Sequence, residues 1–109
     1  MNYPCPCCGK GDIADELKVI ISLLEDRLEE PLPVSSGFRC EKHNASLEGS
    51  SPNSSHLKGL AIDIPCRDSS FRWRLLKALF DMSFSRIETT KPKHIHIDID
   101  PNKAQQVCF

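Results

Sequence analysis

Apolar residues recur at helical spacing in two parts of the chain. In residues 12–30 they fall three or four positions apart, which is typical of a helix that buries one face: Ile13, Leu17, Ile20, Leu24 and Leu28. Asp12 precedes the first of them, where a helix N-cap is expected, and Pro31 ends the segment. A second helix is predicted over residues 70–81, with one apolar side and two further apolar residues beside it: Phe71, Leu75, Leu79 and Met82, then Trp73 and Leu76.

Shorter segments predict strands over residues 34–40, 60–64, 84–88 and 94–100. A short helix is predicted over residues 41–47, and the composition of residues 48–55 is typical of a loop. In the last strand, Ile95, Ile97 and Ile99 share one face, and the other face carries His94, His96, Asp98 and Asp100. This order of elements predicts an α+β fold, a small and mostly antiparallel sheet with two main helices packed on it.

The length and charge of the chain limit the classes of protein that it can belong to. We expect residues 1–109 to form one domain, with a cysteine-rich N-terminal segment at residues 1–11. The net charge of -1 argues against a nucleic-acid binder. The N-terminus lacks the basic start and apolar run of a signal peptide, so we expect synthesis in the cytoplasm. No run approaches the roughly 20 apolar residues of a membrane span, so we expect no membrane-spanning segment. We also expect the protein to be a monomer.

Histidines and aspartates occupy positions that suit a metal site. Asp63 lies between apolar neighbours, where burial is costly unless the carboxylate is paired or binds a metal. His56 lies seven residues earlier, after a serine-rich loop. With one histidine of the 94–100 strand, these residues offer three N/O ligands and room for a water, the pattern of a catalytic zinc site. The alternatives are a loop histidine and an edge strand with a solvated polar face. His43 is interpreted as a surface or capping residue.

Three motifs resemble one known family. They are SSGFRCEKHN at residues 35–44, SHLKGLAIDI at residues 55–64 and HIHID at residues 94–98. In order, spacing and residue type they resemble the zinc D-alanyl-D-alanine carboxypeptidases and phage L-alanyl-D-glutamate endopeptidases (endolysins). That family shares its fold and zinc site with lysostaphin-type enzymes and the hedgehog domain. The Cys-Pro-Cys-Cys-Gly start and the tail at residues 100–106 also resemble small phage-type members.

The resemblance implies a role for individual residues. His56, Asp63 and His96 would hold Zn²⁺, with a water in the fourth position. Arg39 would hold a substrate carbonyl or carboxylate, and Ser55 would also contact substrate. His94 would line the cleft and stabilise the developing oxyanion or assist proton transfer.

The sequence offers two candidates for the general base. Many relatives place an acid three residues before the last zinc histidine, where this chain has Lys93. We expect Asp98 rather than Glu88 to act as the base, because the strand alternation places Asp98 on the same face as the ligand. Either residue could instead orient a ligand histidine.

Six cysteines offer a second possible metal site. Cys5 and Cys8 form a C-x-x-C pair, and Cys5, Cys8, Cys40 and Cys66 could bind a structural zinc. A second C-x-x-C pair is missing, so we expect one catalytic zinc ion and regard the structural ion as less favoured. Disulfides formed after release from the cell, and buried thiols, are the alternatives.

The sequence therefore predicts a zinc metallopeptidase that hydrolyses amide bonds in peptidoglycan stem peptides, as a carboxypeptidase or an endopeptidase. It would act on the cell wall after release from the cell. One alternative is a non-catalytic zinc-binding module of the same fold, which binds the wall or belongs to a phage particle. A third hypothesis is a cysteine-based zinc protein in which the histidines have no role.

Overall fold

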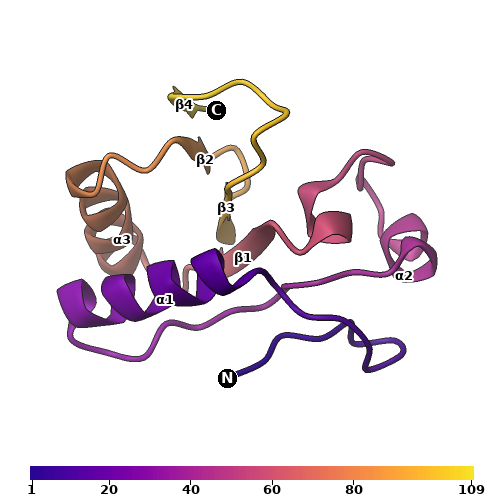
Figure 1. The fold of residues 1–109 in the computed structure, drawn as a ribbon. Coiled ribbons are helices and arrows are strands. Elements are labelled where there is room, and N and C mark those ends of the chain that lie inside the picture. Colours follow the sequence, from indigo (N-terminus) through magenta and orange to yellow (C-terminus); the bar gives the residue numbers. More distant parts are fainter.

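A computed structural model describes residues 1–109 and shows three α-helices and a four-stranded sheet (Figure 1). The helices are α1 (Asp15–Leu28), α2 (Glu41–Ser46) and α3 (Ser69–Asp81), and a 3-10 turn spans Ser55–Lys58. The strands are β1 (Ala61–Pro65), β2 (Arg86–Glu88), β3 (His94–Asp98) and β4 (Val107–Cys108). The α+β class expected from the sequence is confirmed.

The sheet has the order β1-β3-β2-β4, and only the β2–β4 pair is parallel. In the register of β1 with β3, Asp63 lies opposite His96. In the register of β2 with β3, Glu88 lies opposite the same histidine. Residues directly opposite each other point to the same face of a sheet. A row of three polar side chains therefore crosses β1, β3 and β2 on one face.

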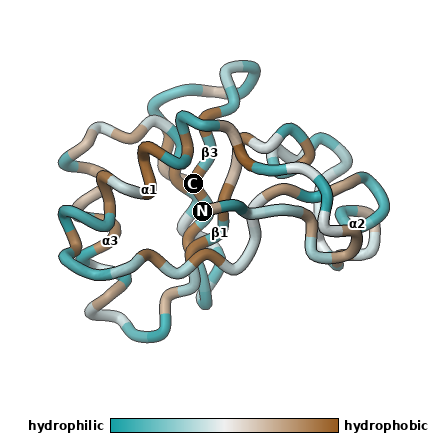
Figure 2. Tube along the Cα trace, turned by 60° about the horizontal axis from the view of Figure 1, so that its bottom comes forward, coloured by the Kyte–Doolittle hydropathy of each residue, from teal (hydrophilic) through white to brown (hydrophobic).

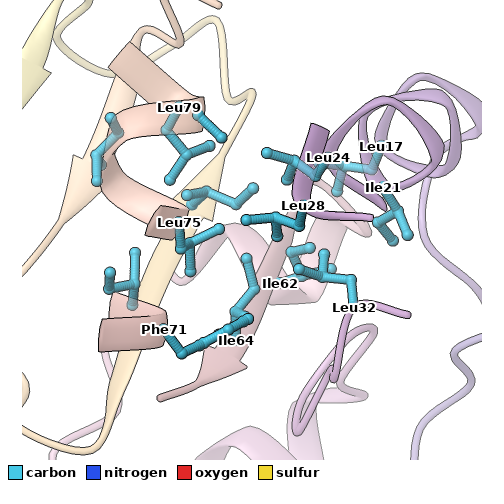
Figure 3. Close-up of a cluster of buried hydrophobic side chains, with 14 of the residues drawn as sticks. Leu17, Ile21, Leu24, Leu28, Leu32, Ile62, Ile64, Phe71, Leu75 and Leu79 are labelled. Atoms are coloured by element: carbon cyan, nitrogen blue, oxygen red, sulfur yellow. The ribbon is translucent and has the colours of Figure 1, made fainter. Parts of the chain in front are cut away.

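The other face of the sheet packs against α1 and α3. Figure 3 shows the side chains of α1 and α3 meeting those of β1, and Figure 2 shows hydrophobic stretches in these elements. The fully buried residues of this core include Leu17, Leu24, Ile62, Leu75 and Ile97. Burial of one such side chain contributes roughly 1.5–3 kcal/mol. The apolar residues of the helices and strands thus pack into one core, and the polar face of the sheet is not covered by a helix.

The start of α1 differs from the sequence prediction. The helix begins at Asp15, and Ala14 occupies the N-cap position without a side-chain hydrogen bond. The Asp12 carboxylate instead accepts hydrogen bonds from the backbone N–H groups of Tyr3 and Ile13, both at 2.8 Å, and pairs with Lys18. Asp12 therefore ties the N-terminal segment to the helix, a long-range contact that helix-capping rules do not describe.

Other local predictions also differ from the structure. Residues 34–40 form only an isolated bridge between Ser36 and Asp63, because the chain then turns to bond with Tyr3 and His56. Trp73 is 64% exposed, since it lies outside the α3 face that packs on the core. Strand β4 was not predicted, because its two residues are too few for an alternation to be recognised.

None of the helices combines the length and the apolar composition that crossing a membrane requires.

Candidate metal centre

Three elements bring His56, Asp63 and His96 together. The 3-10 turn carries His56, β1 carries Asp63 and β3 carries His96. Gly59 ends the turn with φ +70°, and a Cβ there would lie 2.6 Å from the Asp12 carbonyl oxygen. A glycine is needed at this point because the chain both reverses and passes close to another backbone.

Hydrogen bonding orients the ring of His56. Its Nδ1 lies 2.7 Å from the carbonyl oxygen of Gly37, which can only accept, so Nδ1 carries the proton. In the neutral form that can bind a metal, Nε2 bears a lone pair and points at Asp63 Oδ1, 3.3 Å away. A proton or a metal ion must then lie between these two acceptor atoms. Nε2 of His56 is therefore available as a metal ligand.

His96 is oriented in the same way by Asp98. Its Nε2 lies 2.9 Å from Asp98 Oδ2, and its Nδ1 lies 3.0 Å from Asp63 Oδ1. Arg86 donates from Nε to the other oxygen of Asp98 at 2.6 Å. A neutral His96 that donates to Asp98 presents its Nδ1 lone pair toward Asp63. This carboxylate–histidine arrangement is the usual support for a metal-ligating histidine.

The spacing of the three donor atoms fits a zinc ion. Zinc holds nitrogen and oxygen ligands tetrahedrally at about 2.0–2.1 Å, so neighbouring donors lie about 3.3 Å apart. The two measured spacings from Asp63 Oδ1, 3.3 Å to His56 and 3.0 Å to His96, agree with this value. One donor atom from each residue lies within 4.8 Å of the other two. The three residues therefore fit zinc and leave one tetrahedral position for another ligand.

In the metal-free site, hydrogen bonds shift the pKa values of Asp63 and His96 in opposite directions. Burial alone would raise the pKa of Asp63, but hydrogen bonds from His56 and His96 outweigh it and hold that pKa well below its usual range. Burial alone would lower the pKa of His96, but hydrogen bonds to Asp63 and Asp98 raise it to about 9. A proton thus occupies the position between the ligands at neutral pH, and a metal ion would replace it.

Arg39 lies beside the ligands and also lines the cavity above them. Its guanidinium donates to Asp63 Oδ2 at 3.1 Å, to the Ser36 hydroxyl at 3.0 Å and to the Asn44 side-chain oxygen at 3.3 Å. These bonds use three of the five N–H groups of an arginine. Arg39 therefore orients Asp63 and retains two donors.

A polar cavity of about 400 Å³ opens over the ligands. His94 and Glu88 both line it. His94 Nε2 lies 3.9 Å from Asp63 Oδ1, and its side chain is 31% exposed. Glu88 lies beside His96 in the sheet, and its carboxylate forms no hydrogen bond or ion pair within the protein. These two side chains are therefore free to meet a bound molecule.

Asp98 and Ser55 have partners inside the protein. Asp98 is 1% exposed, and its carboxylate accepts from Arg86, from the backbone N–H of Asp100 and from His96. Ser55 is also 1% exposed, and its hydroxyl donates to Asp100 at 2.9 Å. Both side chains thus stabilise the wall of the site.

Sequence reasoning missed several residues that build the site. Arg86 pairs with Asp98, Asn44 holds Arg39, and the Gly37 carbonyl oxygen sets the proton of His56. The alternation of Arg86 and Glu88 in β2 was a usable signal for the first of them. Backbone carbonyl groups and Asn44 carry no pattern that indicates their partners.

Comparison with known proteins agrees with this geometry. The model of the Peptidase M15 family matches residues 6–98, a span that includes all three candidate ligands as well as Arg39 and His94. No curated protein and no solved structure matches the chain significantly. The family match covers most of the chain, so the protein belongs to the M15 peptidases, a family of zinc-dependent metallopeptidases.

Proposed function

We propose that this protein is a zinc peptidase that hydrolyses an amide bond in the peptide part of peptidoglycan. The observation that carries the proposal is the convergence of His56, Asp63 and His96 in the lining of a polar cavity, which also holds the unpaired carboxylate of Glu88 and the ring of His94. Zinc held by the three ligands would supply a Lewis acid for the scissile carbonyl and would make an attacking water more acidic.

Glu88 is the general base of this proposal. Its carboxylate lines the cavity, lies next to a ligand histidine and has no partner within the protein, so it can accept a proton from the attacking water. His94 is placed to donate a hydrogen bond to the oxyanion that develops on the opposite side.

Asp98 has a different part in the proposal. Arg86 and His96 lower its pKa although burial would raise it, so Asp98 is a weak base. Its hydrogen bond to His96 instead directs the Nδ1 lone pair of that ring toward the metal. We therefore assign Asp98 as a positioning residue and reverse the preference that the sequence suggested.

The cavity suits a polar peptide that carries charged groups. Only two of its 18 lining residues are hydrophobic, and side chains of both charges line it, with Arg39, Lys91 and Lys103 among the cations and Glu48 and Glu88 among the acids. Stem peptides of the cell wall carry free carboxylates, which these cations and the two remaining N–H groups of Arg39 would bind. The resemblance to carboxypeptidases and endolysins supports a bond next to a D-residue, cut either at the end of the stem or within it.

The test is cleavage of purified muropeptides by the zinc-loaded protein, followed by mass spectrometry for new amines. We expect Glu88→Gln to lower kcat by two to four orders of magnitude with zinc content unchanged, in line with the roughly 10²–10⁴-fold contribution of a general base. Glu16→Gln, on the exposed first turn of α1, is the matched control and should retain full activity. Absence of cleavage by the wild-type protein across substrates and pH would contradict the proposal.

One observation favours a second function. Lys93 is exposed at the position where relatives place an acid, which suits a zinc-binding module that has lost catalysis. Such a module would bind cell-wall sacculi without releasing product, and Glu88→Gln would leave its binding unchanged.

A further inference from the structure

Four cysteines gather at one point, away from the histidine site. The Sγ atoms of Cys5 and Cys7 are 3.5 Å apart, those of Cys5 and Cys40 are 3.6 Å apart, and those of Cys7 and Cys40 are 3.3 Å apart. The Sγ atom of Cys8 completes a group whose members all lie within 4.8 Å of one another. The four sulfur atoms thus come from two segments that are about thirty residues apart in the sequence.

The local backbone presents three of these thiols from a single turn. The N–H of Gly9 donates to the Cys5 carbonyl oxygen at 2.7 Å, and the N–H of Cys5 donates to the Lys10 carbonyl oxygen at 2.9 Å. Gly9 has φ +69°, so the chain reverses directly after Cys8. Cys40 reaches the turn from the N-cap of α2. The turn therefore supplies three thiols, and Cys40 supplies the fourth from a distant part of the sequence.

We propose that Cys5, Cys7, Cys8 and Cys40 bind a second zinc ion, which is structural rather than catalytic. Zinc–sulfur bonds of about 2.3 Å place the sulfurs of a tetrahedral site about 3.8 Å apart. The three measured distances are only a few tenths of an ångström shorter. Each thiol gives up its proton on binding, and the protein supplies all four ligands, so no position remains for substrate.

A disulfide explains the cluster less well. A disulfide joins two sulfurs at about 2.05 Å and separates that pair from other thiols. Here Cys5, Cys7 and Cys40 are nearly equidistant from one another, and no pair is distinguished. A single ion at the centre uses all four sulfurs equally.

The ligand set differs from the one that the sequence suggested. Cys66 is not part of the cluster, because it follows β1 and its thiol lies 3.6 Å from the Ile64 carbonyl oxygen. Cys7 takes its place. The strand direction of β1 could not be known from the C-x-x-C spacing, so the sequence assigned the wrong fourth cysteine.

The proposed ion would stabilise the segment that supports the histidine site. The N–H of Phe38 donates to the Tyr3 carbonyl oxygen, and the N–H of Arg39 donates to the His56 carbonyl oxygen. Cys40 follows Arg39 directly, and the carbonyl oxygen of Gly37 orients His56. A metal at Cys40 would therefore hold the N-terminal segment against the residues that position one catalytic ligand.

The test is the zinc content of protein purified under reducing conditions and measured by plasma mass spectrometry. We expect two zinc ions per chain in the wild type, one in a Cys5→Ser/Cys40→Ser variant, and one in a His56→Ala/His96→Ala variant. Cys66→Ser/Cys108→Ser is the matched control and should keep both ions. Because the readout is metal content, its result is independent of whether the protein cleaves peptidoglycan.

Cobalt substitution identifies the ligands even if a cysteine variant folds poorly. Cobalt in the His56→Ala/His96→Ala variant should show the intense thiolate-to-cobalt charge-transfer band and the visible bands of a tetrahedral tetrathiolate site. In the wild type, four of the six thiols should resist a thiol reagent until a chelator is added. One zinc per chain in the wild type that persists in the Cys5→Ser/Cys40→Ser variant, or a cobalt spectrum without thiolate bands, would overturn the proposal, as would a mass showing a disulfide within the cluster.

Discussion

Asp98 shows how much of the site depends on residues behind the metal ligands. Its carboxylate is buried between the guanidinium of Arg86, which is 7% exposed, and the ring of His96. Removing one partner of a buried ion pair leaves the other charge without compensation. The residue therefore supports both the orientation of His96 and the stability of the sheet.

We expect Asp98→Ala to lower the free energy of unfolding of the metal-free protein by about 3–5 kcal/mol, because Arg86 would remain buried and unpaired. The same change should weaken zinc binding by about 10–100-fold. Urea unfolding and zinc titration measure the two effects. Asp26→Ala, on the exposed side of α1, should change stability by less than about 0.5 kcal/mol. A loss for Asp98→Ala as small as that of the control would contradict this account.

The pKa shift of His96 predicts the pH dependence of the metal-free protein. Its pKa is raised from 6.5 to about 9 by Asp63 and Asp98 against the effect of burial. A raised pKa stabilises the folded state fully below pH 6.5, and this contribution is lost as the pH rises to about 9. Asp63 has a lowered pKa, so its contribution to stability is lost only at acidic pH, where its carboxylate becomes protonated.

We therefore expect the Tm of chelator-treated protein to fall between pH 6.5 and pH 9 more steeply than that of a His96→Gln variant. The difference between the two curves isolates His96, because the two proteins share every other titratable group. Thermal unfolding followed by circular dichroism measures it. Parallel curves for the two proteins would show that His96 is not protonated in the folded state.

At the scale of elements, the alternation in β1 and β3 separates two functions. One face of these strands packs on α1 and α3, and the other holds Asp63 and His96 opposite each other. This division was predictable, because side chains alternate along a strand whatever the surrounding fold. The position of Trp73 was not, because a residue at the margin of a helical stripe faces core or solvent according to how the helix is rotated.

This difference between helix positions can be measured on α3. We expect Leu75→Ala to lower the free energy of unfolding by about 2–5 kcal/mol, because Leu75 is fully buried and its removal leaves a cavity. Trp73→Ala is the matched comparison on the same helix and should cost less than about 0.5 kcal/mol, since the ring is mostly exposed. Equal losses in chemical denaturation would mean that α3 is rotated from its position in the structure.

At the scale of the whole molecule, metal binding would connect segments that are distant in sequence. The three histidine-site ligands lie on a turn and two strands, and the cysteine cluster joins the N-terminal segment to α2. Any ligand that binds only the folded state stabilises it, by about 2.7 kcal/mol at a free concentration of 100 Kd. Metal ions would thus supplement a small hydrophobic core.

Removal of zinc by a chelator should therefore lower the Tm by about 10 °C or more, since each kcal/mol shifts the Tm of a domain of this size by about 4–8 °C. Differential scanning calorimetry with and without chelator measures the shift. The His56→Ala/His96→Ala variant should retain the part of the shift that the cysteine site contributes. A chelator that leaves the wild-type Tm unchanged would show that no metal stabilises the fold.

Periodicity and motif spacing were enough to predict the helices, three of the strands and the candidate ligands, because those properties follow from neighbouring residues along the chain. The same information could not show that Asp98 pairs with Arg86 while Glu88 stays unpaired, or that Cys7 rather than Cys66 joins the cysteine cluster. Hydrogen-bond partners depend on strand register and on the path of loops, which exist only in the folded chain. The tertiary structure therefore determined which of the available groups are free to react and which hold the others in place.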